Sequence, residues 1–325
     1  MLSESHPTCT ALYSEERCLF TFHTYYSNCM STLVRKASRP IGDKIFRGLL
    51  MSSGLLVLLI CLAMLISLIS NSMEAFSEFG FFRFICSSEW DPTAGREQYG
   101  ALPFIVGTVV TSILALILCI PFSLPVALFI GEYFKGKRIA GVIRSLTDLL
   151  AGIPSIVYGL WGFYTLRPLI DMIDGPQGNG YGILTSVLIL TIMIIPYASS
   201  LTAEFVMLTP KSLKEAAYSL GATRTEVIGS VILPNARSGI IAAYILALGR
   251  ALGETMAVTM LIGNTDKVPT SIFDTGQSMA SLIANQFNEA HGLKLSSLIA
   301  IALVLFLITA IINGIVKIIL NKQRA

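Results

Sequence analysis

The sequence predicts an all-α membrane protein with six transmembrane helices, because it is very apolar and its charges are separated by long uncharged intervals. Of its 325 residues, 54% are hydrophobic and 13% are charged, and the mean hydropathy is +0.71. Soluble domains usually carry charge on about 25% of their residues. The net charge of +3 is too small to indicate a nucleic-acid partner.

The transmembrane helices are predicted from the intervals themselves, since about 20 apolar residues cross a bilayer core as a helix. The first interval, between Arg47 and Glu74, has 26 residues without a charge. Four others separate Glu97 from Glu132, Asp148 from Arg167, Asp174 from Glu204, and Lys294 from Lys317. The sixth predicted helix lies between Arg237 and Asp266 and contains two charges, Arg250 and Glu254.

Prolines within these intervals predict kinks, at Pro121 and Pro125, at Pro154 and at Pro196. The interval from Glu97 to Glu132 is longer than one straight span requires. We expect one broken helix there, because no polar loop interrupts it, and two re-entrant halves are the alternative.

The distribution of Lys and Arg predicts the orientation, because cytoplasmic loops are enriched in them. Seventeen lie on the side that holds both termini, and five lie on the opposite side: Arg83, Arg96, Arg167, Lys267 and Lys294. Both termini are therefore expected in the cytoplasm. The protein itself is expected to span the inner plasma membrane several times, in contact with lipid.

We divide the chain into a poorly ordered cytoplasmic tail, residues 1–45, and a transmembrane domain, residues 46–325. The tail contains Cys9, Cys18 and Cys29, whose spacing matches no metal site, so we expect thiols without metal. An alternative for this tail is that translation starts at Met30, so that residues 1–29 are not made.

Catalysis has little support in the sequence. Residues 131–138, GEYFKGKR, approach a phosphate-binding P-loop, but Arg138 replaces the Ser or Thr that would hold magnesium. The chain has three histidines and none lies near a paired acid or serine. We therefore predict that the chain is not an enzyme and that it has no catalytic residue, ATP site, metal or cofactor.

The cytoplasmic segment 209–234, the coupling segment, is predicted to form two short helices. Its signals are two capping boxes, a helix-ending glycine and a closing proline, namely Ser212 with Glu215, Thr223 with Glu226, Gly221, and Pro234. On physical grounds it is either a connector or a docking surface. Docking is favoured by its small side chains, which let another protein approach closely.

This segment resembles the EAA loop of ABC importer permeases. Glu215-Ala216-Ala217 is followed after three residues by Gly221 and after nine more by Val231-Ile232-Leu233-Pro234, with Val231 where Ile is usual. The resemblance implies that a short helix enters a cleft of a separate ATPase subunit. The residues it assigns to ATPase coupling are Glu215, Ala216, Ala217, Gly221, Leu233 and Pro234.

Two further segments, Leu248–Val258 and Ala151–Leu160, resemble the PstC family of permeases from phosphate-specific ABC importers. The similarity begins near Ile45. It implies a MetI-like fold and half of a translocation path. The implied partners are a homologous second permease, two ATP-binding cassette subunits and an external phosphate-binding protein, which we expect at the outer loop from Asp266 to Gly292.

Arg250 and Glu254 are four residues apart, so on one helix they would face the same side and pair. A charge in the bilayer costs about 2.5–3.5 kcal/mol and faces a bundle interior or a water-filled path. A purely structural interpretation is a salt bridge that fixes helix packing, in which Asp148 or Glu204 could also take part. With the resemblance, we favour a substrate path in which Arg250 binds phosphate oxygens and Glu254 orients the guanidinium.

Three rival functions stay open at this point. Another oxyanion importer, for molybdate or sulfate, would also use an arginine. A secondary transporter without ATP would carry more ionisable ligands in the membrane, often in repeated halves, and a structural anchor leaves Arg250 and Glu254 unexplained. Gly249 and Gly253 predict a close approach of another helix.

Overall fold

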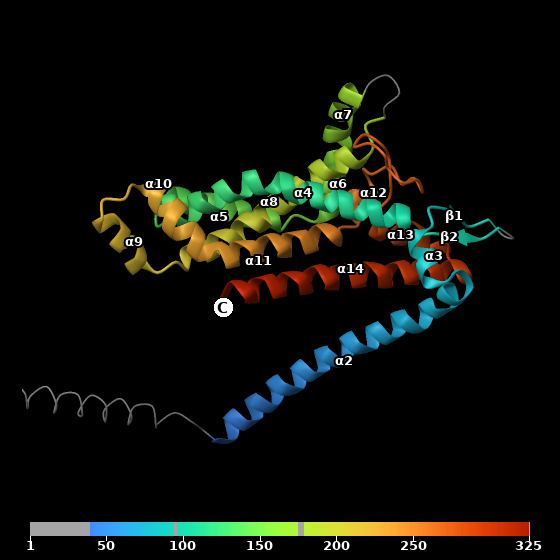
Figure 1. Cartoon of the computed structure of the whole chain (residues 1–325), viewed down its shortest axis with the longest axis horizontal. Helices are drawn as coiled ribbons and strands as arrows, with labels where there is room; N and C mark the ends of the chain where they lie inside the picture. The colour runs from blue at the N-terminus through green and yellow to red at the C-terminus, as the bar shows by residue number, and fades with distance from the viewer. Residues whose placement is uncertain (1–39, 94–95, 175–178, 325) are drawn as a thin grey trace, which may run out of the picture. The chain divides into compact units, whose positions relative to one another are not determined.

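The computed structural model describes residues 40–93, 96–174 and 179–324, and this part of the chain is almost entirely helical (Figure 1). The α-helices are α2 Pro40–Phe79, α3 Phe81–Cys86, α4 Leu102–Leu128, α5 Arg138–Ala151, α6 Ser155–Trp161, α7 Arg167–Asp174, α8 Ile183–Met207, α9 Lys211–Ser219, α10 Arg224–Val227, α11 Leu233–Leu252, α12 Met256–Thr259, α13 Met279–Gln286 and α14 Leu293–Arg324. The π-helical turns are η1 Phe129–Tyr133, η2 Gly162–Leu166 and η3 Ile228–Ile232, and η4 Phe287–Glu289 is a 3-10 turn. Strands β1 Trp90–Asp91 and β2 Gln98–Tyr99 pair antiparallel, with Trp90 opposite Tyr99. The all-α prediction is confirmed.

Contacts divide the chain into two compact units, residues 1–64 and 65–325, and α2 has residues in both. The predicted tail with its cysteines and Met30 lies outside the described residues, except that α2 already begins at Pro40. The proposed boundary at residue 45 therefore falls inside a helix.

Within the described residues, five helices are long and apolar enough to cross a membrane: Lys44–Phe79, Leu102–Tyr133, Ile183–Met207, Arg224–Leu252 and Leu293–Ile315. A sixth is counted only if α5 and the helix Ser155–Asp174 form one span, and these two are bent by 91°. The interval from Glu97 to Glu132 is one span, as expected, because α4 continues into η1 past both of its prolines.

Helix α5 was not predicted, because its residues lie mostly in the charged stretch between the interval that ends at Glu132 and the one that begins at Asp148. A 14-residue helix instead begins at Arg138. Its residues Ile139, Val142, Ile143 and Leu146 recur at helical spacing, which favours a helix over a loop. Pro154 ends it because proline has no amide hydrogen and disfavours helical geometry in the preceding residue.

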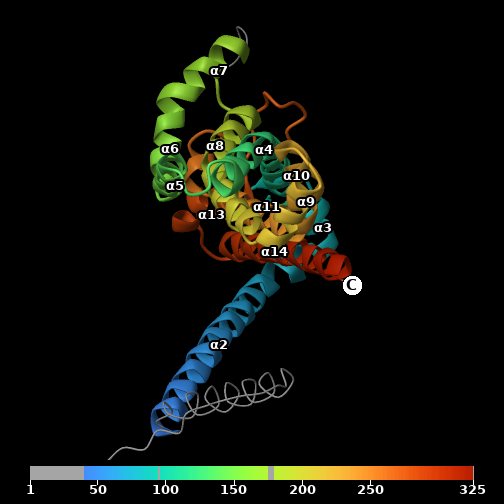
Figure 2. The ribbon, with the colours of Figure 1, turned by 90° about the vertical axis from the view of Figure 1, so that its left-hand side faces the viewer.

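The main core of the second unit lies between α4, α8 and α11, which run side by side in Figures 1 and 2. Its fully buried side chains come mainly from α8, including Ile189, Leu190, Met193 and Ile194. A second core joins α4 to α13, α14 and the β1–β2 pair. Helices α4 and α11 also contact each other directly, and the Ser123 hydroxyl of α4 is hydrogen-bonded to the Tyr244 hydroxyl of α11 at 3.0 Å.

The segment from Asp266 to Gly292 is more structured than the outer loop that the sequence predicted. Its α13 is capped by Ser278, and residues Met279–Leu282 are buried. Thr108 on α4 accepts a hydrogen bond from the Met279 amide at 2.8 Å. At Gly107 a Cβ would lie 2.2 Å from the Gln277 carbonyl oxygen. Only glycine allows α4 to approach the start of α13 this closely.

We expect Gly107→Ala to lower the free energy of unfolding by about 2 kcal/mol, because the added methyl forces α4 away from a backbone atom. Thermal unfolding in detergent measures the change. The matched control is Gly314→Ala on α14, where no atom lies within 4 Å of the new Cβ. There alanine reduces the backbone entropy that is lost on folding, and the free energy of unfolding is expected to rise by about 0.5–1 kcal/mol. Equal effects of the two substitutions would contradict this explanation.

Candidate functional site

The coupling segment begins with the helix–turn–helix arrangement that its sequence indicated. Gly221 has a φ of +83° and ends α9, as predicted. The Thr223 amide donates to Glu226 Oε2 at 2.7 Å, which confirms the second capping box. The first predicted box, Ser212 with Glu215, is wrong. Pro210 occupies the N-cap position instead, and no side chain caps α9.

Pro234 does not close the second helix, in contrast to the prediction. The chain runs from α10 through η3 into α11 without a break, and Leu233 and Pro234 form the first turn of α11. Proline is tolerated there, since amides of the first turn have no intrahelical partner. The coupling segment is therefore joined rigidly to the span that carries Arg250.

Two side chains fasten the coupling segment to the end of α4. Lys214 forms an ion pair with Glu132 of η1, and both side chains are about 10% exposed. Arg224 donates to the Tyr133 carbonyl at 2.8 Å, and its guanidinium lies 4.7 Å from the centre of the Tyr133 ring. The sequence did not predict either contact. They connect α9 and α10 to α4 as well as to α11.

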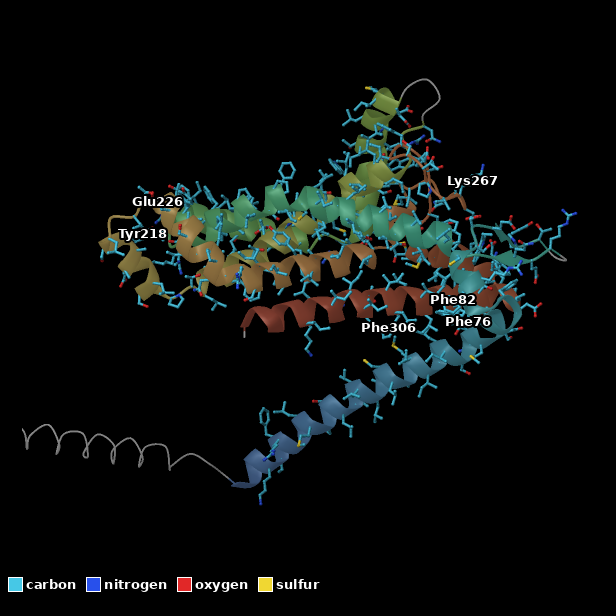
Figure 3. All side chains as sticks on the ribbon, in the orientation of Figure 1. Phe76, Phe82, Tyr218, Glu226, Lys267 and Phe306 are labelled. Carbon is cyan, nitrogen blue, oxygen red and sulfur yellow. The ribbon has the colours of Figure 1, made fainter. Side chains whose placement is uncertain are left out.

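The remaining face of the coupling segment is open. Glu215, Ala216 and Gly221 are exposed, as are three large apolar side chains, Leu213 (47%), Tyr218 (42%) and Leu220 (90%). Figure 3 shows Tyr218 and Glu226 at one end of the second unit and Lys267 at the opposite end. An apolar cluster rimmed by polar residues is typical of a protein interaction surface.

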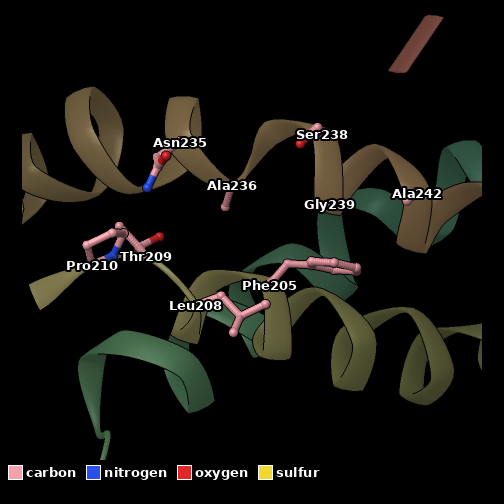
Figure 4. Close-up of a pocket in the computed structure, with 9 residues that line it drawn as sticks. All are labelled: Phe205, Leu208, Thr209, Pro210, Asn235, Ala236, Ser238, Gly239 and Ala242. Atoms are coloured by element: carbon pink, nitrogen blue, oxygen red, sulfur yellow. The ribbon is translucent and has the colours of Figure 1, made fainter. Parts of the chain in front are cut away.

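A groove of about 380 Å³ lies where the coupling segment leaves α8 (Figure 4). It is lined by the end of α8, the linker and the first turns of α11, namely Phe205, Leu208, Thr209, Pro210, Asn235, Ala236, Ser238, Gly239 and Ala242. The Phe205 ring packs directly on Gly239, where a Cβ would lie 2.2 Å from it. Thr209 is 5% exposed, and its hydroxyl has no partner within the described residues. The place where the coupling segment leaves α8 is thus partly buried but not completely filled by side chains.

Arg250 and Glu254 do not pair, and the expectation that they share a helix is wrong. Helix α11 ends at Leu252, with Gly253 as its C-cap, so Glu254 lies in the break before α12. The Glu254 carboxylate accepts a hydrogen bond from the Ala257 amide at 3.2 Å. It therefore stabilises the start of α12, as an anion at a helix N-terminus does.

The guanidinium of Arg250 is left without an acidic partner in the described part of the chain. Its Nε is buried and makes no hydrogen bond there, and its Cζ lies 5.6 Å from the centre of the Tyr197 ring on α8. The other suggested partners are engaged elsewhere: Glu204 pairs with Arg144 at 3.2 Å, and Asp148 accepts from Ser200. A buried donor atom of a charged side chain is costly when it has no partner, and such a position is typical of a binding site.

The two segments that carry the closer resemblance, far apart in sequence, pack against each other. Helix α6 contacts α12, and at Gly159 a Cβ would lie 3.0 Å from the Ala257 Cα and 2.9 Å from the Met260 sulfur. After the break at Gly253, α12 thus packs on α6. By contrast, Gly249 has no atom within 4 Å of its Cβ position and Gly253 has only carbonyls of its own helix. The described chain provides no helix at that pair.

Comparisons with known proteins agree with this geometry. Residues 123–325 match the family described as the inner membrane component of binding-protein-dependent transport systems. The phosphate transport system permease protein PstC of Mesorhizobium japonicum is 41% identical over 299 residues, covering 86% of this chain and 90% of that protein. The protein of the same name from Pasteurella multocida is 39% identical over 305 residues, covering 88% and 94%.

Solved structures show the same fold. An inward-facing MetNI methionine ABC transporter has a chain with a TM-score of 0.54 and 16% identity, covering 68% of this chain and 96% of that one. A bacterial ABC transporter that imports the polysaccharide alginate gives 0.56 and 17%, covering 86% and 99%. The chain belongs to the family of inner membrane components of binding-protein-dependent transport systems.

Proposed function

We propose that this chain is the permease subunit of an ATP-driven phosphate importer and forms half of its translocation path. The support is the Arg250 side chain, whose Nε is buried without a hydrogen-bond partner and whose guanidinium has no acidic partner in the described residues. Relatives covering most of the chain are phosphate transport permeases by name. A guanidinium binds phosphate oxygens through a planar fork of donors.

In this proposal Glu254 shapes the path from the other side of the break in the helix. Since it caps α12 and does not neutralise Arg250, the full positive charge is available to the anion. A path must release what it binds, so weak binding is expected at this point. High affinity then belongs to an external phosphate-binding protein.

The open face of the coupling segment is the proposed contact with one of two ATP-binding cassette subunits. Its exposed Leu213, Tyr218 and Leu220 supply apolar area, and the residues of the EAA resemblance lie on the same segment. A second, homologous permease completes the path. The chain is proposed to lie in the inner membrane with both termini in the cytoplasm, in keeping with the Lys and Arg distribution.

The proposed contact with the external protein is narrower than the whole segment from Asp266 to Gly292, because the first half of α13, Met279 to Leu282, is buried. Within it Asp274 accepts from the Thr270 hydroxyl and from the Thr270 and Ser271 amides, each at 2.8 Å. These hydrogen bonds hold the pKa of Asp274 below its usual value. The loop around Lys267 and Asp274 is thereby ordered and charged at neutral pH.

The test is radiolabelled phosphate uptake into vesicles that contain the assembled complex. Uptake is expected to require internal ATP, and sulfate or molybdate at tenfold excess is expected to leave it unchanged. Uptake by this chain without an ATPase would contradict the proposal, and competition by sulfate or molybdate would assign another oxyanion.

We expect Gly221→Ala to reduce phosphate uptake severalfold while leaving membrane insertion intact, because a side chain in the left-handed region costs about 1–2 kcal/mol and tilts α9. ATP hydrolysis and uptake are measured together to separate coupling from chemistry. The matched control is Gly229→Ala in η3, which has an open Cβ position and no positive φ. Loss of insertion in Gly221→Ala would argue against a docking role.

A further inference from the structure

The turn between η1 and α5 contains a concentration of positive charge that the transport mechanism does not use. It borders a pocket of about 330 Å³ lined by Lys135, Lys137, Arg138 and Arg144, with Gly136, Gly141 and the apolar Ile130, Ala140 and Met207. This is the segment whose sequence approaches a P-loop. A P-loop directly follows a strand, whereas this turn directly follows the helix formed by α4 and η1, so it cannot hold a nucleotide in that manner.

Little negative charge balances these cations within the described residues. Arg144 pairs with Glu204, but both side chains are about half exposed (45% and 53%), and such pairs contribute little. Glu132, the nearest acid in sequence, is committed to Lys214. No side chain caps α5, so its first amides add a favourable field for an anion.

An apolar strip continues from this pocket along α5. Ile139, Val142, Leu146 and Leu149 are 49–69% exposed and recur along one side of the helix, while Ala140 and Thr147 on the other side are buried. The pocket lies at the end of the second unit that holds the coupling segment, because Glu132 and Tyr133, just before it, contact Lys214 and Arg224. The charged and apolar parts thus follow one another along the direction of α5.

We propose that this surface binds an anionic phospholipid, with the headgroup phosphate in the basic pocket and an acyl chain along α5. A basic pocket at a membrane-facing helix end has the charge that such headgroups require. The continuous apolar strip distinguishes a lipid from a free anion, which would need only the pocket. The site is separate from Arg250, so its failure would leave the proposed transport function unaffected.

The first test measures binding of phosphatidylglycerol to the full chain in neutral detergent by native mass spectrometry. Phosphatidylglycerol is expected to bind at least tenfold more tightly than phosphatidylcholine. Replacing the three unpaired cations, in Lys135→Gln/Lys137→Gln/Arg138→Gln, is expected to weaken it roughly tenfold to 100-fold, since each Lys or Arg near an anionic lipid contributes on the order of fivefold. The matched control is Arg83→Gln/Arg96→Gln/Lys267→Gln, which removes three exposed cations elsewhere. Equal weakening by the control would overturn the proposal, as would displacement of the lipid by inorganic phosphate.

The second test does not depend on the basic residues. Leu149→Trp places a fluorophore on the apolar strip, and Ile311→Trp on α14 is the control at a similarly exposed position. In bilayers of equal parts phosphatidylglycerol and phosphatidylcholine, brominated phosphatidylglycerol is expected to quench the α5 reporter at least twofold more than brominated phosphatidylcholine, and the α14 reporter equally. No quenching of the α5 reporter by either lipid would show that protein covers this face and would overturn the proposal.

Discussion

Phosphate uptake is expected to fall by more than about 100-fold when Arg250 is replaced by Gln, while the assembled complex remains intact. The Nε of Arg250 is buried without a hydrogen-bond partner, and no acid of the described residues neutralises the guanidinium. Losing a charge-assisted hydrogen bond costs about 1.5–3 kcal/mol, and losing a bidentate pair costs more. Uptake into vesicles and co-purification of the partner subunits are measured on the same preparation.

The control for Arg250 is Arg237→Gln, which removes an exposed arginine from the same helix and is expected to leave uptake within about twofold. Arg250→Lys retains the charge but not the planar fork, so intermediate uptake is expected. If Arg250→Gln transports normally, the guanidinium serves only to pack on Tyr197, and the substrate path must be sought elsewhere.

Lys214→Met lowers the free energy of unfolding by about 3–5 kcal/mol, because it leaves the buried Glu132 carboxylate without its partner. This is the largest stability effect that we expect from one substitution in the coupling segment. Thermal unfolding in detergent measures it, and proteolysis within residues 209–234 reports local detachment of α9.

Two controls make this result specific. Lys211→Met removes an exposed lysine from the same short helix and is expected to change stability by less than about 0.5 kcal/mol. Glu132→Gln added to Lys214→Met removes the stranded charge and is expected to restore most of the loss. A double variant as unstable as Lys214→Met alone would show that the cost comes from packing.

The sequence predicted the spans because uncharged intervals have a direct physical cause, the expense of placing charge in hydrocarbon. It misplaced features for which two causes compete. The interval around Arg250 has the composition of one helix, but Gly253 ends α11 and separates Arg250 from Glu254. In α5 the basic residues suggested a loop, although the apolar residues between them recur at helical spacing and the helix packs on α8.

Local signals in the coupling segment were reliable when they depended on a few neighbouring atoms. Gly221 and the Thr223–Glu226 box are examples. The Lys214–Glu132 pair joins residues 82 positions apart and depends on how α4 and α9 pack. No local pattern marks it. The same holds for Tyr197, which reaches Arg250 from another helix.

The fastening of α9 to η1 has a consequence for how mechanical work would be shared. A force applied to α9 would be transmitted to α11 through the backbone and to α4 through Lys214 and Arg224, so two spans that contact each other and α8 would move together. The connected helices would then tilt together, and no single helix would have to bend alone. Movement of the short coupling segment could therefore alter the surroundings of the Arg250 guanidinium at the far end of α11 without any span unwinding.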